Sequence, residues 1–206
     1  MTAANILTLL RLLATVPVFI LVYTEGVPAA WAALGVFALA MLTDVFDGML
    51  ARRAPGRSTL GNYLDPVADK VLILSVFICL AIKQIVPAWA VVLLVAREFA
   101  VDGVRAAGAL QGRLVGANWM GKTKTMLETI TVLFALCGLA LQASSIATFG
   151  PTGVGPSGLH DVLWLVGRDL LGLAWWLAVL AALAAAAFAL IFVYWNREVL
   201  RVVRKG

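Results

Sequence analysis

Four aspartates stand close together in a chain that is otherwise strongly apolar. They lie in the stretch 43–70, TDVFDGMLARRAPGRSTLGNYLDPVADK, and are Asp44, Asp47, Asp65 and Asp69. The first two are three residues apart and the last two are four apart, so on helices each pair falls on one face. Acids beside membrane-spanning runs need positive partners, and two divalent cations held by carboxylates meet that need. Such a pair of metals stabilises the negative charge that develops when a phosphoanhydride is cleaved.

Ion pairing at a membrane edge is the simpler explanation for the same acids. Their partners would be the neighbouring cations Arg52, Arg53 and Lys70. Pairing requires neither this spacing nor the glycines Gly48 and Gly61, which leave helix faces open to a flat base or a diphosphate. We therefore favour metal binding.

The composition predicts an integral membrane protein. The 206 residues are 63% hydrophobic and 13% charged, and the mean hydropathy is +0.99. Spans of about 20 residues each would fill the chain as one transmembrane domain, 1–206. The expected fold is an all-α bundle of six transmembrane helices with a long outer loop at about 145–169. The helices are expected at about 4–24, 28–52, 61–84, 87–111, 121–144 and 170–200.

The distribution of Lys and Arg predicts the orientation in the membrane. With a cytoplasmic N-terminus, most cations fall on the cytoplasmic side, and only Lys83 and Arg168 fall on the other. Both termini and all four aspartates would then face the cytoplasm. The net charge of +5 reports this topology and contacts with anionic lipids, so we expect no nucleic-acid partner.

The spacing of the stretch carries a family resemblance. It runs Asp44-x2-Asp47-Gly48-x2-Ala51-Arg52-x8-Gly61-x3-Asp65-x3-Asp69 and resembles the signature of the CDP-alcohol phosphatidyltransferases at every position. The resemblance implies a Mg²⁺ centre of two ions, for which Mn²⁺ is a chemically acceptable substitute. It also implies that the protein is a homodimer.

The same resemblance implies a role for each signature residue. Asp44, Asp47 and Asp65 would bind the metals, and Asp69 would complete the second metal's shell and act as general base. The residues implied to line the CDP pocket are Gly48, Ala51, Arg52 and Gly61. The activated acceptor oxygen would attack the phosphorus on the diacylglycerol side, and CMP would leave.

Polar residues outside the signature extend the expected site. Asn5, Thr8 and Arg11 follow one another at intervals of three and form a polar stripe on the first helix, which we expect near the nucleotide diphosphate. More cations stand at cytoplasmic helix ends than topology alone requires, and they suit a phosphorylated acceptor. These candidates are Arg97, Arg105, Lys122 and Lys124.

Three segments resemble one branch of the family, the bacterial phosphatidylglycerophosphate synthases, over roughly residues 4–135. They are Asn-Ile-Leu-Thr-Leu-Leu-Arg, Ala-Arg-Glu-Phe and Gly-Lys-Thr-Lys-Thr. The resemblance implies CDP-diacylglycerol as donor, sn-glycerol 3-phosphate as acceptor and a location in the bacterial cytoplasmic membrane. Two alternatives with the same chemistry are a cardiolipin synthase of the CDP-alcohol type and a phosphatidylinositol phosphate synthase. A divalent-cation transporter is a third alternative, although its acids should lie at mid-membrane on broken helices.

Overall fold

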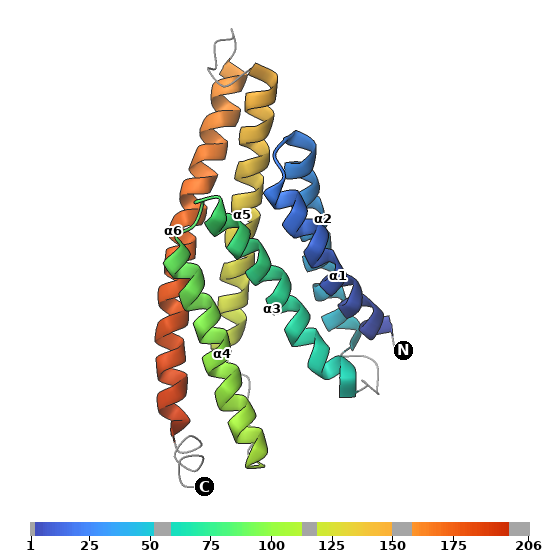
Figure 1. Ribbon diagram of the computed structural model, residues 1–206, viewed down its shortest axis with the longest axis vertical. Coiled ribbons are helices and arrows are strands. Elements are labelled where there is room, and N and C mark those ends of the chain that lie inside the picture. Colours follow the sequence, from blue (N-terminus) through green and yellow to red (C-terminus); the bar gives the residue numbers. More distant parts are fainter. Residues whose placement is uncertain (1–2, 52–58, 113–118, 150–157, 198–206) are drawn as a thin grey trace.

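The computed structural model describes residues 3–51, 59–112, 119–149 and 158–197, and these ranges form six helices (Figure 1). Within them, the side chains at 3–8, 11, 44–51, 59–69, 119–122, 149 and 159–160 lie outside the description. The helices are α1 (Ala3–Tyr23), α2 (Val27–Ala51), α3 (Thr59–Ile82), α4 (Ala88–Leu110), α5 (Trp119–Phe149) and α6 (Gly158–Trp195). The first five agree with the expected helices to within a few residues at most ends.

The helices alternate in direction, so each connection reverses the chain. In Figure 1, α1 lies against α2 and α3, α4 lies along α6, and α5 lies between α6 and α2. Gly26 allows the reversal between α1 and α2 because its φ of +121° suits glycine. Gly112 has a φ of +68° and ends α4, where its N–H donates to the Ala109 carbonyl at 3.0 Å. The start of α1, the end of α2 and the start of α3 therefore lie at one end of the bundle.

The expected long loop at about 145–169 is wrong. Helix α5 continues to Phe149 and α6 already begins at Gly158, so helix occupies most of the segment. Two polar side chains near the end of α5 have their hydrogen bonds satisfied within that helix. The hydroxyls of Ser144 and Thr148 each donate at 2.8 Å to the carbonyl four residues earlier, so they need no loop to be satisfied.

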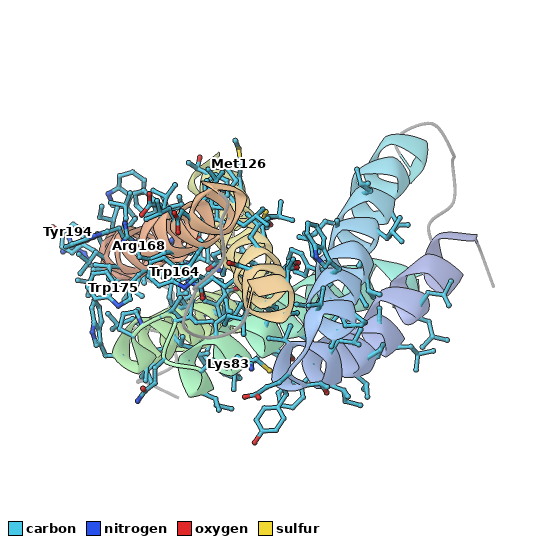
Figure 2. All side chains as sticks on the ribbon, turned by 90° about the horizontal axis from the view of Figure 1, so that it is seen from above. Lys83, Met126, Trp164, Arg168, Trp175 and Tyr194 are labelled. Atoms are coloured by element: carbon cyan, nitrogen blue, oxygen red, sulfur yellow. The ribbon has the colours of Figure 1, made fainter. Side chains whose placement is uncertain are left out.

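One apolar core runs through all six helices. Its largest fully buried side chains are Phe37, Phe77, Leu72, Leu80, Leu94 and Leu136. The exterior is also apolar, and large side chains such as Met126, Trp164 and Tyr194 are exposed (Figure 2). A surface of this kind suits lipid and not water. Among the described residues, the stretches Thr123–Thr148 and Asp161–Trp195 are long and apolar enough to cross a membrane.

Both ends of α6 carry an arginine beside an aromatic ring. The Arg168 guanidinium lies 5.4 Å from the Trp164 ring centroid, and that of Arg197 lies 4.6 Å from the Tyr194 ring. The two rings are separated by about 45 Å along a helix that rises about 1.5 Å per residue. That distance matches a bilayer with its headgroups, about 40–45 Å, and aromatic residues favour both interfaces.

The contact between α5 and α6 depends on two glycines and yields a stability prediction. A Cβ on Gly138 would lie 2.8 Å from the Gly167 carbonyl oxygen and 2.9 Å from Leu171. Because backbone cannot yield as a side chain can, we expect Gly138→Ala to lower the free energy of unfolding by about 1–3 kcal/mol. Thermal unfolding in detergent measures the effect.

Gly172 provides the matched control on α6. A Cβ there meets nothing within 4 Å, so Gly172→Ala should leave the protein as stable or stabilise it by up to about 1 kcal/mol. Equal unfolding temperatures for the two variants would contradict the close helix contact.

Candidate active site

The four aspartates lie on two consecutive helices at the same end of the bundle. Asp44 and Asp47 are in the last two turns of α2, and Asp65 and Asp69 are in the first half of α3. Their side chains lie outside the described residues. Four carboxylates supply hard oxygen ligands, which fit Mg²⁺ by their chemistry. The described side chains, which do not include these aspartates, contain no group of three or more His, Cys, Asp or Glu suited to a metal.

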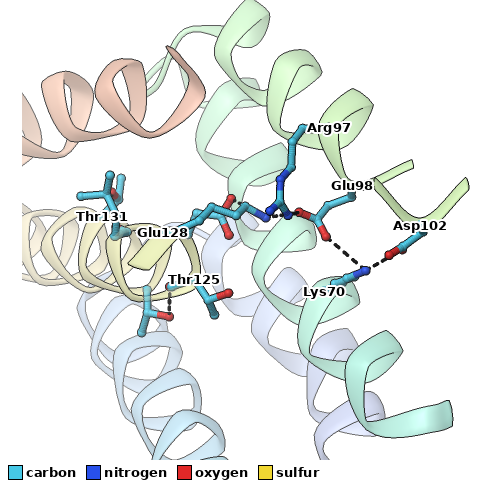
Figure 3. A network of polar contacts seen from close by, with 10 residues as sticks. Lys70, Arg97, Glu98, Asp102, Thr125, Glu128 and Thr131 are labelled. Carbon is cyan, nitrogen blue, oxygen red and sulfur yellow. Dashed lines mark hydrogen bonds and ion pairs between the residues drawn. The ribbon is translucent and has the colours of Figure 1, made fainter. Parts of the chain in front are cut away.

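A network of ion pairs joins α3, α4 and α5 directly beside this region (Figure 3). Glu98 on α4 is its centre. Its Oε1 contacts Arg97 of the same helix and Lys124 of α5, and its Oε2 lies 3.2 Å from the Lys70 Nζ of α3. Lys70 also donates to Asp102 Oδ2 at 2.5 Å. One carboxylate therefore holds cations from three helices.

The network runs from the bundle interior to its surface. The side chains of Glu98, Lys124 and Glu128 are 7%, 6% and 3% exposed, whereas Asp102 is 49% exposed. Glu128 Oε1 lies 3.0 Å from Lys124 Nζ, an ion pair without good hydrogen-bond geometry. Buried charges are stable only when they are paired, so the inner part of this cluster depends on its counter-ions.

The structure brings two of the four candidate acceptor cations together. Arg97 and Lys124 meet at Glu98, and Arg105 lies at the network's edge, 4.0 Å from Asp102 and 5.8 Å from the Phe192 ring. The side chain of Lys122 lies outside the described residues. Arg97 and Lys124 thus contact the same carboxylate oxygen, whereas Arg105 does not contact Glu98 and lies beside Asp102.

The candidate CDP-binding residues fall at the same end of the bundle as the aspartates. Asn5, Thr8 and Arg11 lie in the first half of α1, Gly48 and Ala51 in the last turns of α2, and Gly61 at the start of α3. The structure describes their helices but not the side chains of these residues, and Arg52 lies outside the described ranges.

Sequence reasoning did not place Lys70, Glu98, Asp102 and Glu128 in the site. A signal was present, since Glu98 with Asp102 and Lys124 with Glu128 are each four residues apart on a helix face. Acids inside apolar helices require partners, and that requirement alone indicates a cluster. It does not say which helices supply the cations.

A cavity of about 430 Å³ opens at the other end of the bundle. Its walls come from the turn between α1 and α2, the second half of α5 and Lys83, which follows α3. The aspartates lie at the opposite ends of α2 and α3, so this cavity is separate from the candidate active site.

Comparison with known proteins decides the family. The sequence model of the CDP-alcohol phosphatidyltransferase family matches residues 1–154, about three quarters of the chain. The chain belongs to the CDP-alcohol phosphatidyltransferase family. This confirms the resemblance found in the signature, and it identifies the bundle as that of a membrane-embedded transferase. The matched segment contains the four aspartates and every residue of the network.

Relatives of this CDP-alcohol phosphatidyltransferase carry more specific names. A protein of Mycobacterium tuberculosis named "Probable phosphatidylglycerophosphate synthase" is 42% identical over 138 residues, which are 65% of this chain and 65% of the relative. The aligned segment thus spans just under two thirds of that relative.

Two further relatives are named CDP-diacylglycerol--glycerol-3-phosphate 3-phosphatidyltransferase. That of Bacillus subtilis is 36% identical over 62% of this chain and 72% of its own length. That of Rickettsia bellii is 41% identical over 66% of this chain and 74% of its own length.

Proposed function

We propose that this protein transfers the phosphatidyl group of CDP-diacylglycerol to sn-glycerol 3-phosphate, giving phosphatidylglycerol phosphate and CMP. The choice of glycerol 3-phosphate as acceptor rests on the cluster of Lys70, Arg97 and Lys124. Lys70 belongs to α3, the helix that bears Asp65 and Asp69, and the other two cations meet it at Glu98. Clustered cations suit a phosphomonoester better than an uncharged alcohol. The names of the relatives support the same donor and acceptor.

The proposed reaction uses the signature residues in distinct roles. Asp69 takes the proton of the acceptor hydroxyl, and the oxygen forms a bond to the diacylglycerol-side phosphorus while the bond to the CMP oxygen breaks. Two Mg²⁺ ions, held by the four aspartates, supply stabilisation of the diphosphate charge when bound. The residues proposed to hold CDP are Gly48, Ala51, Arg52 and Gly61, with Asn5, Thr8 and Arg11 from α1.

The acceptor phosphate is assigned to the cations around Glu98. Arg97 and Lys124 contact it at their shared position, and Arg105 guides it there from the edge of the cluster. Lys122 is the fourth cation proposed for this phosphate. The proposal includes one transmembrane domain with six spans and both termini in the cytoplasm of a bacterial cell. It further includes a homodimer, a property taken from the family resemblance.

An acceptor panel tests the function. Purified protein in detergent receives CDP-diacylglycerol and Mg²⁺ with glycerol 3-phosphate, phosphatidylglycerol or inositol phosphate, and CMP release is measured. We expect release with glycerol 3-phosphate to exceed release with phosphatidylglycerol by at least about 100-fold, because a site built to pair a phosphomonoester is left incompletely paired by a phosphodiester. Inositol phosphate carries the same phosphomonoester, so the ratio of its rate to that with glycerol 3-phosphate decides between these two acceptors. Preference for phosphatidylglycerol or inositol phosphate would replace the proposed acceptor and retain the chemistry.

A proteoliposome experiment addresses the transporter alternative. Uptake of a divalent cation that is abolished by Asp65→Ala, together with no CMP release from any acceptor, would contradict the transferase proposal.

A further inference from the structure

We propose that Glu98 is the positioning residue of the acceptor site. Its carboxylate holds Lys70, Arg97 and Lys124 together, so that they face one acceptor phosphate as a preformed group. This inference rests on the proposed function and extends it to a residue that does not itself bind an anion.

Burial makes a counter-ion necessary. Lys124 and Arg97 are 6% and 11% exposed at their side chains, and both contact the same Glu98 oxygen. Two cations this close repel each other strongly in an interior of low dielectric. The carboxylate between them removes that repulsion, and without it the two side chains would move apart.

One hydrogen-bond donor of the cluster has no partner among the described residues. Within the described part of the chain, Arg97 Nε is buried and has no hydrogen-bond partner. A guanidinium offers five N–H donors in a fixed fork, which suits two oxygens of one phosphate. A buried donor without a partner is costly, and a bound phosphate oxygen would satisfy it. The cluster therefore retains one buried donor, Arg97 Nε, that its own carboxylates leave for another anion.

Glu98 also connects the cations to α3, the helix that bears the proposed general base. Its second oxygen lies 3.2 Å from Lys70 Nζ, and Lys70 directly follows Asp69 in α3. The same carboxylate thus fixes the position of the proposed phosphate site on α4 and α5 relative to the turn of α3 that bears the proposed general base. Correct spacing between the two would place the acceptor hydroxyl for attack.

The test separates binding of the two substrates. Glu98→Gln keeps the shape of the side chain and removes its charge. We expect the KM for glycerol 3-phosphate to rise about tenfold or more, and the KM for CDP-diacylglycerol to stay within about twofold, because charged hydrogen bonds are lost on the acceptor side only. Initial rates of CMP release, with each substrate varied in turn, give both constants.

Three further variants make the result specific. Glu25→Gln, the same change at an exposed residue between α1 and α2, should leave both constants unchanged. Glu98→Asp keeps the charge on a shorter side chain and should raise the acceptor KM by less than Glu98→Gln. The double variant Glu98→Gln/Lys124→Met should bind the acceptor no worse than Lys124→Met alone, because the two residues act together.

Several outcomes would overturn the inference. One is an acceptor KM that falls or stays constant in Glu98→Gln, since Glu98 would then compete with the phosphate or not affect it. A second is an equal rise in both KM values. A third is a double variant whose acceptor KM rises by the product of the two single effects, since Glu98 and Lys124 would then act independently. If Glu98→Gln does not fold in detergent, an acceptor KM unchanged in Glu98→Asp overturns the inference instead.

Failure of the proposed function has a different signature. The wild type would then release no CMP with glycerol 3-phosphate, and the variants are measured with the acceptor that does support release. A preferred acceptor that lacks phosphate, with its KM raised selectively by Glu98→Gln, would overturn the assignment of a phosphate to this cluster.

Discussion

Asp69→Asn is expected to lower the rate of CMP release by about 1,000-fold or more, because the substitution removes the proposed general base and weakens a proposed metal ligand together. An amide cannot accept the proton of the acceptor hydroxyl at neutral pH. It also carries no charge to hold a divalent cation. The measurement is CMP release by purified protein in detergent with saturating CDP-diacylglycerol and glycerol 3-phosphate.

Metal removal and a matched substitution accompany that experiment. EDTA should abolish the wild-type reaction, and excess Mg²⁺ should restore it. Asp169→Asn makes the same chemical change at an exposed residue of α6 that pairs with Arg168, and it should retain full activity. Full CMP release by Asp69→Asn, or a wild type indifferent to EDTA, would contradict the proposed mechanism.

Lys124→Met is expected to lower the free energy of unfolding by about 3 kcal/mol, because it leaves the buried carboxylate of Glu128 without its counter-ion and removes one of the three cations at Glu98. Glu98 and Glu128 both contact Lys124, and their side chains are 7% and 3% exposed. Methionine has similar length and cannot neutralise either. The variant should also bind glycerol 3-phosphate at least about tenfold more weakly, since it loses a proposed partner of the phosphate. Thermal unfolding and acceptor KM measure the two effects.

A double variant separates the loss of charge balance from the loss of shape. In Lys124→Met/Glu128→Gln the unpaired charge of Glu128 is removed as well, so part of the lost stability should return. The acceptor KM should stay high, because the cation is still missing. Lys83→Met, at the other end of α3, is the control and should change neither quantity by much. Normal stability of Lys124→Met would show that the buried cluster does not need this lysine.

The helix positions and the family can be predicted from local patterns in the sequence. Helix positions are set by apolar runs and by breaks such as Gly26 and Gly112, and α1 to α4 lie within a few residues of the expected ranges. The family follows from the spacing of Asp44 to Asp69, because both aspartate pairs and the glycines between them are near in the chain. Periodicity and motif spacing are local properties, which a sequence displays directly.

The extent of α5 and α6 was the main error in the fold. The loop was expected from the glycines and prolines at 150–156, and the residues on either side of them were assigned to it. On those two sides, the hydroxyl of Thr148 donates to a carbonyl of α5 itself, and Gly167 lies where α6 meets Gly138. A close contact between helices overrides local propensity, and the sequence does not show which residues meet.

The sequence by itself determined the reaction family, the apolar helices and the positions of the aspartates along them. Only the tertiary structure decided that Lys70, Arg97 and Lys124 converge on Glu98 from three helices. Residues separated by 26 positions, as Glu98 and Lys124 are, come together because α4 and α5 both pack against α3. These helix contacts depend on how the whole bundle packs. An acid inside an apolar helix indicates that a partner exists, but the sequence does not identify the partner.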